Sequence, residues 1–171
     1  MKRQFCYLCA TKLEPKNDHS WWCSSCQYTQ YENPRPCVEL ILFHEDKILI
    51  CERGCEPSKG AYDFPGGFVE CGETYERAIA REIQEELQLN KTDYSDVHYL
   101  TSFHTPYPFG KEVYDNIVAV FTAKLIASPD RVIVSDDVAS VRWVTKDQLE
   151  SIEWASAKHL ENARLVFLDN I

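Results

Sequence analysis

The segment GGFVECGETYERAIAREIQEELQL, residues Gly66–Leu89, constrains the fold of this chain more than any other. Its paired glycines permit backbone conformations that are closed to other residues, which indicates a loop. Ile79, Ile83 and Leu87 then recur every four residues and predict the buried face of a helix. Thr74, just before this pattern, is typical of an N-cap. We therefore expect a glycine-rich loop that leads into an amphipathic helix.

Three carboxylates share a second face of this helix. Glu82, Glu85 and Glu86 fall at positions i, i+3 and i+4, so their side chains point together. Like charges at this spacing destabilise an isolated helix by a few tenths of a kcal/mol per pair. Arg81 alone cannot neutralise three carboxylates, whereas hard divalent cations, Mg²⁺ above all, suit clustered carboxylate oxygens. The pattern indicates either a divalent-metal site or a solvated acidic face.

The spacing of residues 67–89 resembles the signature of the Nudix hydrolases, G-x5-E-x7-R-E-U-x-E-E-x-G-U, where U is a bulky aliphatic residue. The chain fills eight of the nine fixed positions, including every charged one. The exception is Gln88, where the family has glycine. That glycine looks like a helix C-cap, and its loss should cost about 1 kcal/mol or less if a left-handed residue is needed.

The resemblance implies both a fold and a reaction. The fold is of the α/β class, a Nudix-type α/β/α sandwich with a mixed sheet. The reaction is attack by water on the pyrophosphate of a nucleoside diphosphate that is linked to another moiety. Because such a substrate is itself strongly anionic, metal ions must lie between it and the acidic helix.

The rest of the chain carries strand and helix patterns that suit this fold. Apolar runs bounded by turn residues predict strands at residues 38–43, 47–53, 97–104, 116–126 and 139–144. Thr145 and Gln148 form a capping-box pattern for a short helix. A last helix is expected from Ser156 to about Leu168.

Four cysteines near the N-terminus have the spacing of a metal site. Two C-x2-C pairs, 13 residues apart, can together form a closed tetrahedral Zn²⁺ site. Residues 1–30 hold too few apolar side chains to fold without such a cross-link, so the zinc would be structural. His19 in place of one cysteine, or four free or oxidised thiols, are the alternatives. The expected ligands are Cys6, Cys9, Cys23 and Cys26.

Two prolines separate this zinc ribbon from the rest of the chain. Pro34 and Pro36 make the joining segment stiff and extended. We expect a zinc ribbon and linker over residues 1–35 and a Nudix hydrolase domain over residues 36–171.

The composition predicts a cytoplasmic protein without membrane contact. No apolar run approaches the roughly 20 residues of a membrane span, and no signal-peptide pattern follows the basic N-terminus. The remaining cysteines have no paired spacing and suit a reducing compartment. They are Cys37, Cys51, Cys55 and Cys71.

The charge argues against a nucleic-acid partner. Net charge is −9 at pH 7, whereas phosphate binding needs Lys and Arg. The first 36 residues carry two more basic than acidic side chains, and four thiolates with one Zn²⁺ cancel this excess. Trp21 and Trp22 could stack on a base, but packing of the ribbon against its neighbour is the commoner use. We expect a structural ribbon, which could also build a homodimer interface.

The resemblance assigns roles to the residues of the signature. Glu82 and Glu86 are expected to be the principal Mg²⁺ or Mn²⁺ ligands, with Glu85 as a third. The backbone carbonyl of Gly67 is expected to complete the site. Glu73 either reaches the same metals or only forms hydrogen bonds where the helix begins.

Arg81 and a distant loop supply the other candidate catalytic groups. Arg81 is expected to orient a glutamate through a bidentate salt bridge. In many family members the general base comes from a loop before a strand that carries a tryptophan. Here Asp137 lies six residues before Trp143. Asp136 is its rival, Glu85 is the other candidate base, and either aspartate could instead cap a turn.

Substrate choice must come from outside the signature. A zinc ribbon before a Nudix domain resembles the NADH pyrophosphatases, whose downstream S-Q-P-W-P-F-P-x-S array is only partly kept here, as Pro-Tyr-Pro-Phe at residues 106–109. The layout is more similar to shorter ribbon–Nudix proteins, some of which act on FAD or ADP-ribose.

The expected substrate is therefore a dinucleotide cofactor or a nucleotide sugar such as ADP-ribose, FAD or NADH. Phe103 and Tyr107 are candidates for base stacking, and Arg53 and Lys59 for phosphate binding, against a solvated loop position. The alternatives are a catalytically silent nucleotide sensor and an isopentenyl diphosphate isomerase. The intact acids argue against the sensor, and the position of Cys71 argues against the isomerase.

Overall fold

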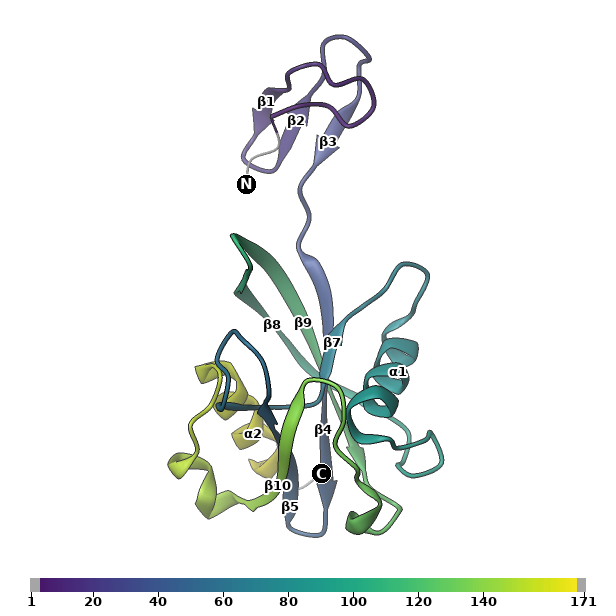
Figure 1. The fold of residues 1–171 in the computed structure, drawn as a ribbon, viewed down its shortest axis with the longest axis vertical. Helices are drawn as coiled ribbons and strands as arrows, with labels where there is room; N and C mark the ends of the chain where they lie inside the picture. Colours follow the sequence, from purple (N-terminus) through teal and green to yellow (C-terminus); the bar gives the residue numbers. More distant parts are fainter. Residues whose placement is uncertain (1–3, 169–171) are drawn as a thin grey trace.

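The computed structural model describes residues 4–168, which form a small and a large sheet (Figure 1). The small sheet contains β1 (Glu14–Asn17), β2 (Ser20–Trp22) and β3 (Thr29–Tyr31), all antiparallel. It lies at one end of the molecule, and residues 32–34 connect it to the large sheet. The zinc-ribbon segment is therefore a separate layer of structure rather than an edge of the main sheet.

The large sheet is mixed, as the resemblance implied. Its order is β10-β5-β4-β9-β8, with β4 and β9 parallel and the other neighbours antiparallel. Two short strands lie off this path, β6 on β5 and β7 on β4. The strands are β4 (Arg35–His44), β5 (Lys47–Arg53), β6 (Tyr62–Asp63), β7 (Gly66–Phe68), β8 (His98–Phe109), β9 (Glu112–Lys124) and β10 (Val138–Thr145).

The strands β4 and β5 diverge, and this divergence makes room for the site. They pair only next to their turn, where Phe43 and His44 oppose Ile48 and Lys47. Beyond that point β7 pairs with β4 and β6 pairs with β5. The loop that precedes the acidic helix therefore enters the sheet between the two diverging strands.

Two helices cover opposite faces of the sheet (Figure 1). The helix α1 (Tyr75–Leu87) buries Ile79, Ile83 and Leu87 against one face, and α2 (Ala157–Leu168) buries Ala163 and Val166 against the other. The residues of β4 alternate between these two cores. Each fully buried Leu or Ile contributes about 1.5–3 kcal/mol, so both faces stabilise the fold. The predicted α/β/α sandwich is confirmed.

Short 3-10 helices complete the fold. They are η1 (Pro129–Arg131) and η2 (Lys146–Ser151). The predicted capping box is present at η2, where Gln148 accepts a hydrogen bond from the backbone N–H of Thr145. The last helix also agrees closely with the predicted range.

The strand β8 extends further than its sequence suggests. The sequence predicts a strand that ends at His104, but β8 continues through Pro106 and Pro108 to Phe109 opposite β9. Because β8 is the edge strand of the sheet, an N–H missing from its outer side breaks no hydrogen bond. The prediction was wrong here since edge position cannot be read from one strand alone.

Both ends of α1 have the predicted caps. The Oγ1 of Thr74 accepts a hydrogen bond from the backbone N–H of Arg77 at 3.4 Å. Gln88 follows the helix in the left-handed region, with φ 53°, and its N–H bonds back to Gln84. A side chain at this position is strained, which is why the family pattern has glycine here.

The replacement Gln88→Gly should stabilise the protein, because it relieves the left-handed strain at an exposed position. We expect a gain of up to about 1 kcal/mol in the free energy of unfolding, or a rise of about 2–4 °C in Tm for a chain of this size. Differential scanning calorimetry tests this. The matched control Gln84→Gly, in the exposed middle of the same helix, should instead lose about 1 kcal/mol. If Gln88→Gly and Gln84→Gly changed the Tm equally, Gln88 would not be a strained left-handed cap.

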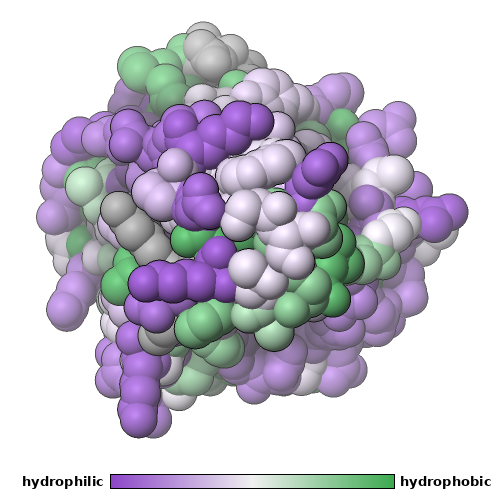
Figure 2. Space-filling model, turned by 90° about the horizontal axis from the view of Figure 1, so that it is seen from above, coloured by the Kyte–Doolittle hydropathy of each residue, from purple (hydrophilic) through white to green (hydrophobic). Residues whose placement is uncertain are grey.

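The surface seen from the ribbon end is mostly hydrophilic, with apolar groups in small patches between polar side chains (Figure 2). In residues 4–168, none of the helices is both long and apolar enough to cross a membrane.

Candidate active site

A cavity of about 510 Å³ lies where β4 and β5 diverge. This is the size of a pocket for a small organic ligand. It is lined from both diverging strands, from β7, α1 and α2, from the β8–β9 hairpin and from the loop before β10. It contains most of the residues that the sequence singled out: Gly67, Arg81, Glu82, Glu86, Asp136, Asp137, Arg53, Phe103 and Tyr107.

Three candidates lie outside the lining. Glu73 and Glu85 do not line the cavity but contact Arg81, which does. Lys59 is exposed and is not among the lining residues, so the structure does not bring it together with the others.

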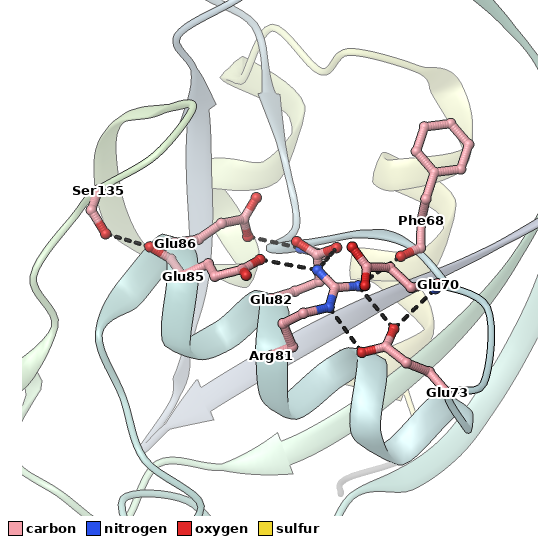
Figure 3. A network of polar contacts seen from close by, with 9 residues as sticks. Phe68, Glu70, Glu73, Arg81, Glu82, Glu85, Glu86 and Ser135 are labelled. Carbon is pink, nitrogen blue, oxygen red and sulfur yellow. Dashed lines mark hydrogen bonds and ion pairs between the residues drawn. The ribbon is translucent and has the colours of Figure 1, made fainter.

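Arg81 joins three of the carboxylates (Figure 3). Its Nε and Nη2 donate to the two carboxylate oxygens of Glu73 at 2.9 and 3.0 Å. Its Nη1 donates to Glu82 at 2.8 Å and to Glu85 at 3.0 Å. Nη2 also donates to the carbonyl of Phe68 on β7 at 2.8 Å. One guanidinium therefore fixes the glycine-rich loop to α1 and sets the orientation of Glu82.

Glu86 is held differently and is more deeply buried. Its Oε2 accepts a hydrogen bond from the backbone N–H of Gly66 at 2.9 Å, and only 6% of the residue is exposed. Burial first, and the nearby Glu82 second, raise the pKa of Glu86 to about 9. Burial also raises the pKa of Glu82, although Arg81 opposes this. A bound divalent cation would favour the ionised form of both groups.

Gly67 on β7 lies directly against the Glu82 carboxylate of α1. A Cβ at this position would lie 2.4 Å from Oε1 of Glu82 and 2.8 Å from its carboxyl carbon. The glycine of the signature is therefore explained by the space that the Glu82 carboxylate occupies.

The replacement Gly67→Ala should displace the Glu82 carboxylate and lower kcat/KM by about tenfold to 100-fold, because a misplacement of about 1 Å can cost this much. Steady-state kinetics would measure it, on whichever substrate the panel proposed below identifies. A suitable control is Gly72→Ala, where an added Cβ meets nothing within 4 Å, although its φ of +90° makes some loss of stability expected. If Gly67→Ala retained full activity, the close approach would not matter for the reaction.

The loop with the candidate general base is anchored on two sides. The backbone N–H groups of Ile133 and Ser135 donate to the carbonyls of Leu87 and Glu86 at 3.1 and 2.9 Å. These carbonyls belong to the last turn of α1, where they lie too close to the end of the helix to accept a hydrogen bond within it. On the other side, the N–H of Gly54 donates to the carbonyl of Asp137 at 2.6 Å.

This anchoring places Asp136 and Asp137 on the rim of the cavity. Both are exposed, and Asp136 has a left-handed backbone, with φ 56°. The charge of Asp137 contributes to the raised pKa of Glu82 and of Glu86, after larger causes. Asp137 therefore lies near enough to the carboxylates of α1 to interact with them.

Arg53 is not a solvated loop charge. Its Nη1 pairs with Asp63 at 2.6 Å, its Nε donates to the carbonyl of Pro57 at 2.7 Å, and its Nη2 contacts the hydroxyl of Tyr107 at 3.3 Å. It lines the cavity and contacts Tyr107, another of the candidate substrate residues.

Sequence reasoning missed several polar residues on the α2 side of the cavity. His159 of α2 contacts Glu39 of β4 at 3.1 Å and Ser156 at 3.3 Å. Burial by itself lowers the pKa of His159, but the carboxylate of Glu39 outweighs it, and the net direction is upward. The available signal was a charged residue inside the apolar strand VELILF. The missed lining residues also include Asp63, Glu70 and Asn116.

The ribbon brings its four predicted cysteines together. Their Sγ atoms all lie within 4.8 Å of one another, with Cys6 3.7 Å from Cys26 and Cys9 3.5 Å from Cys23. A tetrahedral zinc with Zn–S bonds of about 2.3 Å needs S···S distances of about 3.8 Å. A disulfide needs about 2.05 Å, and all four thiols are free. The donor set therefore fits a tetrahedral metal, and His19 is not part of it.

Across residues 4–168, this is the one group of three or more His, Cys, Asp or Glu whose ligand atoms converge so closely. The carboxylates of α1 are instead spread between Arg81 and the N–H of Gly66.

Comparison with known proteins agrees with the fold and the signature. The family model described as NUDIX domain matches residues 33–165. The chain belongs to the Nudix family. A NUDIX hydrolase from Nitrosomonas europaea shares the fold, with a TM-score of 0.71 and 22% identity over 98% of this chain and 92% of that one.

Two curated Nudix relatives have named activities. NAD-capped RNA hydrolase NudC of Salmonella schwarzengrund is 30% identical over 145 residues, which are 84% of this chain and 52% of that protein. ADP-ribose pyrophosphatase of Methanocaldococcus jannaschii is 48% identical over 63 residues, 37% of each chain. The chain thus spans about half of the first relative's length and less of the second.

Proposed function

We propose that this Nudix domain is a metal-dependent pyrophosphohydrolase. Its substrate would be a nucleoside diphosphate linked to another moiety. The observation that carries the proposal is the pair of buried carboxylates, Glu82 and Glu86, that line one cavity beside Arg81. Buried acids with raised pKa values are typical of functional sites rather than of solvated faces.

The residues of the signature would hold the metal. Glu82 and Glu86 are the proposed principal ligands of Mg²⁺ or Mn²⁺, with Glu85, Glu73 and the carbonyl of Gly67 as further candidates. Oxygen-rich donor sets of this kind suit both ions. When bound, such a cation neutralises the charge of the diphosphate and lowers the pKa of the attacking water.

The other groups would position the substrate and move the proton. Asp137, on its anchored loop, is proposed to accept the proton of the attacking water, and Asp136 and Glu85 are the alternatives. Arg81 holds Glu82 in place through the salt bridge at 2.8 Å. Arg53 is proposed to contact a phosphate, and Lys59, outside the cavity lining, is the weaker candidate for this role.

The substrate class follows from the relatives and from the cavity. Both curated relatives are named for compounds that contain an ADP-ribose unit or an NAD cap. The cavity also carries aromatic side chains, among them Phe103 and Tyr107, that suit a flat base. With a net charge of −9, the chain favours a nucleotide-type small molecule over a long nucleic acid.

The proposal also covers the metal of the ribbon and the cellular location of the protein. The four cysteines would bind structural Zn²⁺, and the eight free cysteines of the chain suit the reducing cytoplasm. A homodimer is proposed on the family resemblance alone, and size-exclusion chromatography with light scattering would test it.

The test is phosphate release from a panel of NADH, NAD, FAD, ADP-ribose, diadenosine polyphosphates and dNTPs, with phosphatase to free the products. NAD-capped RNA is a separate arm. Metal-dependent cleavage of one compound would support the hydrolase and identify its substrate. If no compound of the panel were cleaved but one of them raised the Tm of the protein, the result would support the nucleotide sensor instead.

A further inference from the structure

The cavity continues along the face of the sheet that α2 covers. On β8 and β9, the directly opposed pairs on this face are Phe103 with Val118, Thr105 with Asn116, and Tyr107 with Tyr114. Asn116 therefore lies in the middle of this row, with an apolar pair on one side and two tyrosines on the other.

Asn116 is an unusual residue for its position. Only 3% of it is exposed, it lines the cavity, and its Oδ1 is buried without a hydrogen-bond partner among the described residues. Buried polar groups in native proteins are nearly always paired, because an unpaired one costs folding free energy. The next residues on this face of β9, Val118 and Val120, are apolar. A valine at 116 would suit the strand better, so the amide needs a functional explanation.

Several aromatic rings lie on the tyrosine side of this amide, next to the Tyr107–Tyr114 pair. The ring of Phe68 lies 6.0 Å from that of Tyr107 and 6.3 Å from that of Tyr114, edge-on to both. Tyr114 stacks on Phe109 at 5.1 Å and has the guanidinium carbon of Arg35 3.1 Å from its ring centre, so its own faces are covered, whereas Phe109 is 53% exposed. Flat ring systems bind well against such surfaces. The place beside Asn116 therefore offers both ring contacts and one unsatisfied acceptor.

We propose that Asn116 recognises the base of the substrate, by accepting a hydrogen bond from an amino or amide N–H of a flat heterocycle. A carboxamide presents an acceptor beside a donor, which matches adenine, as asparagine does in DNA recognition. It matches the primary carboxamide of nicotinamide equally well. The proposal rests on the proposed function, since it names the part of that substrate that this end of the cavity holds.

Binding of mononucleotides tests this without any hydrolysis. Isothermal titration calorimetry on the full chain would compare AMP with purine riboside 5′-monophosphate, which lacks the amino group. It would also compare nicotinamide mononucleotide with nicotinic acid mononucleotide, which lacks the amide N–H. We expect one N–H-bearing probe to bind about 10- to 100-fold tighter than its twin. Preference within the first pair assigns adenine, and preference within the second assigns nicotinamide.

The variants attribute the preference to one side chain. In Asn116→Leu the ratio of the two affinities within the preferred pair should fall to about one. Asn116→Asp keeps an acceptor oxygen and should therefore keep part of the preference. Thr122→Val, which removes a buried polar group further along β9 and outside the cavity lining, should leave the ratio unchanged. If Asn116→Leu does not fold, the reduced preference expected of Asn116→Asp still tests the proposal.

Three results would overturn the proposal: equal affinities within both pairs, a preference that survives in Asn116→Leu, or no binding of any probe. None of these depends on turnover, so they are separable from a failure of the hydrolase. Base discrimination without cleavage of the panel would keep Asn116 as the recognition residue of a sensor.

Discussion

Replacement of Glu86 by glutamine should lower kcat/KM by about 10²- to 10³-fold, because a metal ligand contributes several kcal/mol to stabilising charge in the transition state. The amide keeps the shape of the side chain and can still accept the hydrogen bond from Gly66, so the fold should persist. The rate on the substrate found in the panel, at saturating Mg²⁺, measures this. Glu76→Gln in the exposed first turn of the same helix should stay within about twofold.

The same replacement should stabilise the metal-free protein. In the fold, burial raises the pKa of Glu86 from 4.5 to about 9. Its contribution to stability is thus fully present below pH 4.5 and is lost as the pH rises toward 9. Glutamine does not titrate, so the variant should gain in Tm over the native protein between pH 5 and 9 in EDTA. Saturating Mg²⁺ should reverse the order.

This pair of effects distinguishes a functional carboxylate from a structural one. If Glu86 served only the fold, Glu86→Gln would lower the Tm of the protein at every pH. If Glu86→Gln proved both active and less stable, the assignment of Glu86 as a metal ligand would be wrong. The acid thus lowers stability where it serves the reaction, a common trade-off at active sites.

The acidic half of the site could be predicted from sequence because it is local. Gly67 and Glu82 are connected by a loop and a helix whose periodicity and caps are visible in the chain itself. Even the departure at Gln88 was interpretable, since the left-handed cap depends only on residues of that helix.

The other half of the cavity could not be predicted, because it depends on pairing between distant strands. Glu39 meets His159, 120 positions later, only after α2 packs on the sheet. The sequence around Asn116 predicts a strand but does not show which residues lie opposite it. Only the register of β8 and β9 places Asn116 beside the Tyr107–Tyr114 pair. Arg53 similarly needs Asp63 and Tyr107 to show that it is not a solvated charge.

Removal of the metal from the ribbon should unfold residues 4–31 while the large sheet remains folded. The buried apolar side chains of the ribbon are few, Leu13 and Trp21 beside Cys6 and Cys23, with Tyr28 packed against them. Metal binding contributes about 10–16 kcal/mol in zinc-finger peptides, far more than such a core provides. The two sheets share no strand, so unfolding of one need not propagate to the other.

Hydrogen exchange after chelation would show this directly. The N–H groups of Cys6 and Cys23, which donate to Thr11 and Tyr28 at 2.8 and 2.9 Å, should lose protection. The β4–β9 ladder should keep its protection, because it lies at the centre of the large sheet. Cys23→Ser should reproduce the loss without a chelator, whereas Cys71→Ser, at an exposed cysteine outside the ribbon, should not. Protected ribbon amides in both the chelated protein and Cys23→Ser would mean that the ribbon folds on its own core and that the four thiolates have another role.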